Sequence, residues 1–130
     1  MPSYLNVATL LDLARRAHAH APGPCACTKT PLDGWQSQPL SLDESQFREI
    51  GTLWPENDPE PTYAEYLPGK LTYWSADAPI APRYFPYNRC AVWECTLCGR
   101  LYLHYTEGGG YFVDRRMRSL QWALIEDVSL

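Results

Sequence analysis

Ala91-Val-Trp-Glu-Cys-Thr-Leu-Cys-Gly-Arg-Leu-Tyr-Leu-His-Tyr105 is the stretch of this 130-residue sequence on which the fold depends. Both of its ends are rich in branched and aromatic residues, which favour strands. Its middle places Cys95 and Cys98 three positions apart and follows them with Gly99, a residue that takes a positive φ without steric cost. The pattern predicts two antiparallel strands joined by a tight turn that presents both thiols.

The sequence after this stretch extends the predicted sheet. Tyr111-Phe-Val-Asp114 has the composition of a strand, and the glycine-rich segment 107–110 before it indicates a hairpin turn. We therefore expect an antiparallel three-stranded meander, followed by a last helix or strand at about 119–125.

The N-terminal part of the chain is expected to be helical. Apolar residues at helical spacing predict a first helix from about Leu5 to His18, which the segment 21–24, Ala-Pro-Gly-Pro, would end. Ser41 followed by Glu44 has the form of a capping box and predicts a second, short helix that stops at Gly51.

A proline-rich segment separates these helices from the strands. Seven prolines between residues 55 and 86 exclude a long helix or a central strand. The segment is also too apolar for a disordered linker, so we expect an ordered loop packed on the core. The predicted fold is α+β: N-terminal helices packed on a small antiparallel three-stranded meander with a long ordered proline and aromatic loop, in a single zinc-stabilised domain of residues 1–130.

A second pair of cysteines, Cys25 and Cys27, lies on a loop flanked by proline and glycine. Together with Cys95 and Cys98 this pair offers four thiolates, the donor set of a closed, tetrahedral, structural Zn2+ site. Such a site would close a loop of about 70 residues and would couple folding to metal binding. The fifth cysteine, Cys90, is expected to be a packed core thiol.

The sequence alone leaves alternatives to this ligand set open. The thiols can be free or paired in disulfides, although an odd number of cysteines in an apparently cytosolic chain argues against a disulfide framework. Iron accepts the same set of sulfur ligands as zinc. Cys90, His18 or His20 can replace one of the cysteines, whereas His104, in the middle of a predicted strand, is given no role.

The motif from about Cys90 to Tyr105 resembles the zinc knuckle of zinc-ribbon and rubredoxin-type proteins. The resemblance implies a hairpin tip whose backbone amides donate hydrogen bonds to the sulfurs. It implies a metal-binding element and no particular activity. The common ribbon uses a second C-x-x-C pair, whereas this chain has Cys25-Ala-Cys27.

Composition and charge narrow the class of function. The net charge of −4 argues against a general affinity for nucleic acid, although six arginines against three acidic residues in 83–118 indicate a local basic face. No apolar run is long enough to span a membrane and no signal-peptide pattern is found, so we expect a cytoplasmic protein. Because no established catalytic motif occurs either, we expect a protein that is not an enzyme.

A protein that acts by binding another protein fits most of these features. The loop 54–87 combines aromatic residues with acidic ones, a mixture typical of interfaces. The acidic residues are Glu56, Asp58, Glu60 and Glu65. In general character the chain is similar to the small immunity proteins of bacterial toxin systems, which implies that the acidic loop covers a basic toxin. The zinc ion would then fix the ends of this loop.

Two other classes of function remain as alternatives. One is a zinc-ribbon nucleic-acid-binding or regulatory protein, in which arginines contact phosphates and tyrosines stack on bases. Its residues would be Arg100, Arg115, Arg116, Arg118, Tyr102 and Tyr111. The other is a small enzyme with an unrecognised site, for which Cys90 and His104 supply a thiol and an imidazole.

Overall fold

The computed structural model describes residues 3–109 and 111–130. Its regular elements are α1 (Val7–His20), β1 (Gln36–Ser37), β2 (Phe47–Thr52), β3 (Ala91–Cys95), β4 (Leu101–Gly109) and β5 (Phe112–Ser119). Short 3-10 helices lie between them, η1 (Ala26–Thr28), η2 (Glu44–Gln46), η3 (Tyr87–Arg89) and η4 (Trp122–Leu124). Gly110, in the turn predicted before the last strand, lies outside the described residues.

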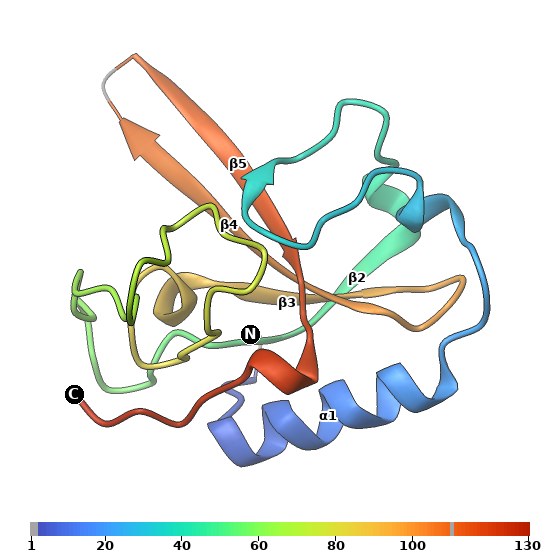
Figure 1. Cartoon of the computed structure of the whole chain (residues 1–130). Coiled ribbons are helices and arrows are strands. Elements are labelled where there is room, and N and C mark those ends of the chain that lie inside the picture. The colour runs from blue at the N-terminus through green and yellow to red at the C-terminus, as the bar shows by residue number, and fades with distance from the viewer. Residues whose placement is uncertain (1–2, 110) are drawn as a thin grey trace.

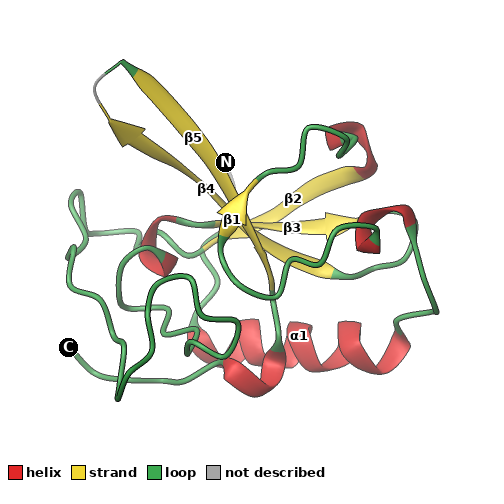
Figure 2. Ribbon diagram, turned by 45° about the horizontal axis from the view of Figure 1, so that its top comes forward, coloured by secondary structure: helices red, strands yellow, loops and turns green. Residues whose placement is uncertain are grey.

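The strands form one antiparallel sheet in the order β1-β5-β4-β3-β2 (Figures 1 and 2). The predicted meander β3-β4-β5 is present at its centre, but a strand is added on each side. β1 pairs with β5 through Gln36 and Ser37, and β2 pairs with β3 with a shift of register between Glu49 and Gly51. The prediction of N-terminal helices packed on a three-stranded meander is therefore wrong: one α-helix accompanies a five-stranded sheet within the described residues.

The segment predicted as a second helix forms η2 and then β2. Asp43, and not Ser41, caps η2, because its carboxylate accepts a hydrogen bond from the N–H of Ser45. The chain then pairs with β3, whose outer edge would otherwise leave backbone groups without partners. Gly51 does not stop a helix. A Cβ there would lie 2.5 Å from Leu5 Cδ1, so glycine lets the N-terminal segment pack on β2.

The first predicted helix is confirmed as α1, two residues further along the chain at each end. Asn6 caps it, because Oδ1 of Asn6 accepts a hydrogen bond from the N–H of Thr9 at 2.8 Å. Leu10 and Ala14 form its buried stripe, as the spacing of apolar residues predicts. No helix in the described part of the chain has the length and apolarity needed to cross a lipid bilayer.

Apolar clusters cover both faces of the sheet. Leu101, Leu103 and Tyr105 of β4 belong to the first-face cluster, which includes residues of α1 and the long loop. Tyr102 belongs to the second-face cluster, with Cys27 and other residues of the segment 25–47. The central strand β4 is therefore buried on both sides, and the cysteine-bearing segment covers the face opposite α1.

The segment 53–86 is the ordered, irregular loop that the prolines predict (Figure 1). Its Ile80 is fully buried and forms a parallel bridge with Ile125 near the C-terminus. Its Tyr73 stacks on Trp35, with 6.0 Å between the ring centroids. Contacts between rings and aliphatic side chains thus replace regular hydrogen bonding as the means by which this loop packs on the sheet.

Arg118 of β5 joins this loop to the sheet. Its side chain is 0% exposed, and its guanidinium donates hydrogen bonds to the hydroxyl of Tyr87 at 2.6 Å and to the carbonyl of Ala78 at 2.7 Å. A third hydrogen bond reaches the carbonyl of Ala76 at 3.2 Å. Among the described residues no carboxylate forms an ion pair with Arg118, so oxygen atoms of the loop and of Tyr87 stabilise the buried charge.

Replacing Arg118 by alanine should lower the free energy of unfolding by about 3 to 5 kcal/mol, because buried acceptors lose their donor and a cavity forms. Denaturation in urea measures the loss. Arg115→Ala is the matched control on the same strand and should have a far smaller effect, because the ion pair of Arg115 with Glu44 is about half exposed. Equal losses in both variants would contradict the role assigned to Arg118.

Candidate metal centre

The four predicted cysteines lie together beside the turn between β3 and β4. The sulfur atoms of Cys25, Cys27, Cys95 and Cys98 are all within 4.8 Å of one another. The distance is 3.8 Å between Cys25 Sγ and Cys95 Sγ, and 3.5 Å between Cys27 Sγ and Cys98 Sγ. A metal ion bonded to four sulfurs at about 2.3 Å in a tetrahedron separates them by about 3.8 Å. The spacing fits one such ion.

The turn presents Cys95 and Cys98 as the sequence predicts. The N–H of Cys95 donates to the carbonyl of Arg100 at 2.9 Å, and the N–H of Gly99 donates back to the carbonyl of Cys95 at 2.8 Å. Gly99 has a φ of 81°, the left-handed conformation that glycine adopts without strain. The backbone amides of Leu97 and Cys98 donate to the sulfur of Cys95, as the resemblance to a zinc knuckle implies.

The other pair of thiols does not form a second knuckle. Cys25 precedes η1 and Cys27 lies within it. The hydroxyl of Thr28 holds this turn, since it accepts from the N–H of Cys25 at 3.0 Å and donates to the carbonyl of Cys25 at 2.8 Å. Arg100, directly after the knuckle, donates to the carbonyls of Pro22 at 2.8 Å and Gly23 at 3.2 Å. Arg100 therefore also connects the turn between β3 and β4 to the segment that precedes Cys25 and Cys27.

Side-chain donors surround the sulfur atoms. Gln46 Nε2 lies 3.3 Å from Cys95 Sγ and 3.7 Å from Cys25 Sγ, and the hydroxyl of Tyr102 donates to Cys27 Sγ at 3.2 Å. Hydrogen bonding to Cys98 also raises the pKa of Arg100. Such donors offset the net negative charge that four thiolates place around a divalent ion.

Gln46 and Tyr102 were not identified from the sequence as residues of the metal centre, and Tyr102 was considered only as a residue that could stack on bases. Tyr102 sits on β4, in a region predicted to be a strand, and its side chain is 3% exposed. Gln46 ends η2, in a segment predicted to be helical. No spacing rule links either residue to the cysteines, because the contacts arise from the pairing of β2 with β3 and from the second-face cluster.

The thiols differ in their readiness to ionise. Burial raises the pKa of Cys95, but hydrogen bonds from Gln46 and from the amides of Cys98 and Leu97 outweigh burial and lower this pKa to about 7. Burial also raises the pKa of Cys27 far above its ordinary value, and although the Tyr102 hydrogen bond opposes this rise, the neighbouring thiols add to it. Four thiolates this close repel one another, and a bound divalent cation removes the repulsion.

Cys90 lies outside this centre. It is 0% exposed, its thiol donates to the carbonyl of Pro86 at 3.4 Å, and burial raises its pKa well above the ordinary value. The prediction of a packed core thiol is confirmed. Cys90 belongs to the first-face cluster, whereas the ring of His104 stacks on Trp93, a residue packed against the second-face cluster. The sheet thus separates this thiol from this imidazole.

The other histidines are also placed away from the sulfur atoms. His18 and His20 are exposed in the last turn of α1, and neither belongs to the group of cysteines. His104 Nε2 lies 3.1 Å from Gln38 Oε1, and burial lowers the pKa of His104 to about 4. This imidazole is therefore neutral at physiological pH. All four members of the close group are cysteines.

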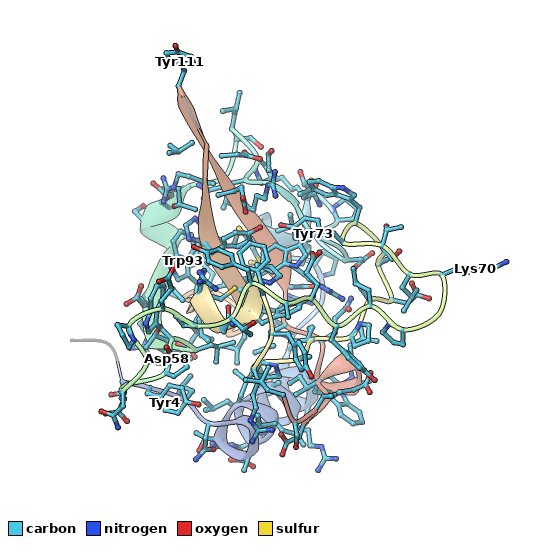
Figure 3. All side chains as sticks on the ribbon, turned by 90° about the vertical axis from the view of Figure 1, so that its left-hand side faces the viewer. Tyr4, Asp58, Lys70, Tyr73, Trp93 and Tyr111 are labelled. Atoms are coloured by element: carbon cyan, nitrogen blue, oxygen red, sulfur yellow. The ribbon has the colours of Figure 1, made fainter. Side chains whose placement is uncertain are left out.

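The arginines of the predicted basic face contact other parts of the chain. Arg115 pairs with Glu44, and Arg116 pairs with Asp114 at 2.9 Å. Arg118 is buried under the loop, and Arg100 holds the loop before Cys25. Of the two predicted stacking residues, Tyr102 is buried and Tyr111 is exposed at the end of the β4–β5 hairpin (Figure 3).

The prediction that a zinc ion fixes the ends of the long loop is wrong, because the four cysteines lie away from both ends. Phe47 of β2 pairs with Cys95, whereas Thr52 pairs with Ala91. The loop leaves β2 after Thr52 and returns before Ala91, at the end of these strands that is away from the cysteines. Arg118 contacts this loop instead.

Comparisons of the chain with models of known protein families, with curated protein sequences and with solved structures give no match. They support neither a zinc ribbon nor an immunity protein.

Replacing Tyr102 by phenylalanine should weaken metal binding by about 10- to 100-fold, because Cys27 loses the hydroxyl that stabilises its thiolate. Competition with a chromogenic chelator measures the affinity. Tyr111→Phe removes a hydroxyl from a fully exposed ring and should leave the affinity unchanged. An unchanged affinity in Tyr102→Phe would show that this hydrogen bond does not support the centre.

Proposed function

We propose that this protein holds one structural zinc ion through Cys25, Cys27, Cys95 and Cys98 and acts without catalysis, by binding a protein partner. The spacing of the sulfur atoms, 3.5 and 3.8 Å across the two pairs, carries the metal part of this proposal. Four protein ligands leave no position for water or substrate, the property that separates structural from catalytic zinc.

Both zinc and iron accept four thiolates. We propose zinc because a protein that acts by binding needs no redox chemistry from its ion. The ion would join Cys25 to Cys95, which are 70 positions apart in the sequence, and Cys27 to Cys98, which are 71 positions apart. Metal binding to such sites contributes about 10 to 16 kcal/mol to the folding of small zinc peptides.

The chain purified with zinc should contain one ion, and Cys98→Ala should lose this ion and unfold or nearly unfold. Elemental analysis measures the metal, and circular dichroism measures the fold. Cys90→Ala is the matched control and should keep the ion, because Cys90 lies in the first-face cluster, away from the four cysteines. After Co2+ replaces Zn2+, the intense absorption of a tetrahedral four-thiolate complex should appear in the unchanged chain and in Cys90→Ala but not in Cys98→Ala. A folded Cys98→Ala chain with unchanged metal content would overturn the zinc assignment.

The surface that we propose for the partner is an acidic corner, made of Tyr4, Trp54, Glu56, Asp58 and Tyr63. The first four of these residues line an open groove between the N-terminal segment and the start of the long loop. Tyr4 and Asp58 lie near each other on this side of the molecule (Figure 3). Trp54 is 39% exposed and Tyr63 is 64% exposed, so large rings are available for contact.

The rings of the acidic corner are held from beneath by Arg89. Its guanidinium carbon lies 4.0 Å from the centre of the Tyr63 ring and 5.4 Å from that of Trp54. The same guanidinium donates to the carbonyls of Pro61 at 2.6 Å and Thr62 at 3.1 Å. Rings that are already fixed lose little conformational entropy on binding, which is a property of interface anchors.

Charge gives the acidic corner its preference for a partner. Segment 54–69 contains four acidic residues and no lysine or arginine. Glu56 and Asp58 are exposed, and neither forms an ion pair with another described residue. A basic protein surface complements this charge, as in the immunity proteins that cover a basic toxin. The arginines of the predicted basic face already contact other parts of the chain, and this favours a basic protein partner over nucleic acid.

Reversing the charge of the acidic corner with Glu56→Lys and Asp58→Lys should weaken binding of the partner by about ten-fold or more. The partner is first captured from the host with the unchanged chain, purified, and measured by calorimetry at several salt concentrations. Asp33→Lys with Glu126→Lys reverses two exposed charges outside the groove and is the matched control. A partner that binds all three chains equally, or a captured nucleic acid, would contradict this surface.

A further inference from the structure

The four cysteines of the metal centre form two pairs that each join distant segments, and we call them the crossed pairs. Cys25 Sγ lies 3.8 Å from Cys95 Sγ, and Cys27 Sγ lies 3.5 Å from Cys98 Sγ. A disulfide bond is about 2.05 Å long, so each crossed pair would close by a movement of about 1.5 to 1.8 Å. Once an ion no longer holds them apart, these sulfur atoms are close enough to bond to each other.

Each crossed pair combines one accessible cysteine and one buried cysteine. Cys25 is partly exposed. Cys98 is also partly exposed, and it follows Leu97, which is 70% exposed at the tip of the knuckle. Their partners are buried, with Cys95 0% and Cys27 2% exposed. An oxidant in solvent therefore meets Cys25 or Cys98 first, and a buried thiol at contact distance stands ready to react with the product.

Pairing within each segment is less favourable than crossed pairing. Cys25 and Cys27 are two positions apart, and a disulfide between such near neighbours departs from the preferred geometry and is strained. A bond between Cys95 and Cys98 would leave only this strained bond for the other two thiols. The crossed pairs join residues 70 and 71 positions apart and close the same large loop as a metal ion.

We infer that the metal centre is also a site of reversible oxidation by hydroperoxides, at which two crossed disulfides replace the ion as the connection between the segments. This inference rests on the proposed zinc centre. The segment with Cys25 and Cys27 would stay on the sheet in both forms, because ion and disulfides join the same positions. The acidic corner starts from the other end of β2 and is unaffected by the exchange.

The chemistry of one crossed pair consumes one hydroperoxide. The accessible thiolate attacks one oxygen of hydrogen peroxide, the O–O bond breaks, and a sulfenic acid and a hydroxide ion result. The buried thiolate attacks the sulfur of the sulfenic acid, the S–S bond forms, and a second hydroxide leaves. Two protons from solvent convert both hydroxides to water. Both pairs together give four electrons to two peroxides, and the zinc ion leaves as Zn2+ with its charge unchanged.

The test uses the zinc-loaded Cys90→Ala chain, whose only thiols are the four of the metal centre. Hydrogen peroxide is added in steps, while a chromogenic chelator measures the released zinc and a thiol reagent counts free cysteines. About two molecules of peroxide for each ion should release the zinc and remove all four thiols. Dithiothreitol with Zn2+ should restore both.

Tryptic digestion without reduction locates the new bonds. Peptides 17–29 and 90–100 carry the two pairs of cysteines and should be joined in the oxidised chain. Partial reduction and alkylation followed by mass spectrometry should assign Cys25 to Cys95 and Cys27 to Cys98. Bonds confined to either peptide, sulfinic acids in place of disulfides, or four intact thiols with the zinc still bound would each overturn the inference.

Circular dichroism compares the two forms that lack an ion. The oxidised chain should keep its strand signal, whereas the reduced chain stripped by a chelator should lose most of it. Equal loss in both would show that disulfides do not replace the ion. A purified chain that takes up no zinc would contradict the proposed function instead, and the peptide map of the oxidised chain would still confirm or refute the crossed pairing.

Discussion

The closeness of four sulfur atoms, all within 4.8 Å of one another, is the constraint on which the rest of this structure depends. It requires the segment with Cys25 and Cys27 to cross the face of the sheet opposite α1. That segment then buries Leu32 against Tyr102 and Met117 and closes the second core cluster. The four-cysteine group is thus a part of the core, so an ion bound there and the second-face cluster would stabilise each other.

The cysteines and the long loop lie at opposite ends of β2 and β3. The cysteines lie where β2 and β3 begin their pairing at Phe47 and Cys95, and the long loop leaves from the other end of these strands. Arg118 attaches the loop, and Arg89 supports the rings of the acidic corner. A bound ion can therefore stabilise the whole sheet without constraining the proposed binding surface, which is shaped by cation–π contacts and carbonyl hydrogen bonds.

Arginine has a structural function in much of this chain. Arg100 holds the loop before Cys25, Arg116 bonds to the hydroxyls of Tyr73 and Tyr105, and Arg118 is buried. The fork of donors on a guanidinium lets one side chain satisfy several carbonyl or hydroxyl oxygens at once. The local excess of arginine in the C-terminal half therefore stabilises irregular segments, and the exposed acidic residues are left to dominate the outer surface of the long loop.

Local sequence was sufficient for features whose causes are local. It predicted α1 from apolar spacing, the β3–β4–β5 meander from strand composition, the knuckle from Cys95, Cys98 and Gly99, and the four thiols as one group from their chemistry. Only the tertiary structure decided that residues 47–52 form a strand, because pairing with β3 outweighs a weak helical pattern. It also decided that Gln46 and Tyr102 contact the sulfurs and that Arg118 is buried, because those contacts join residues 21 to 75 positions apart, a separation that no local pattern encodes.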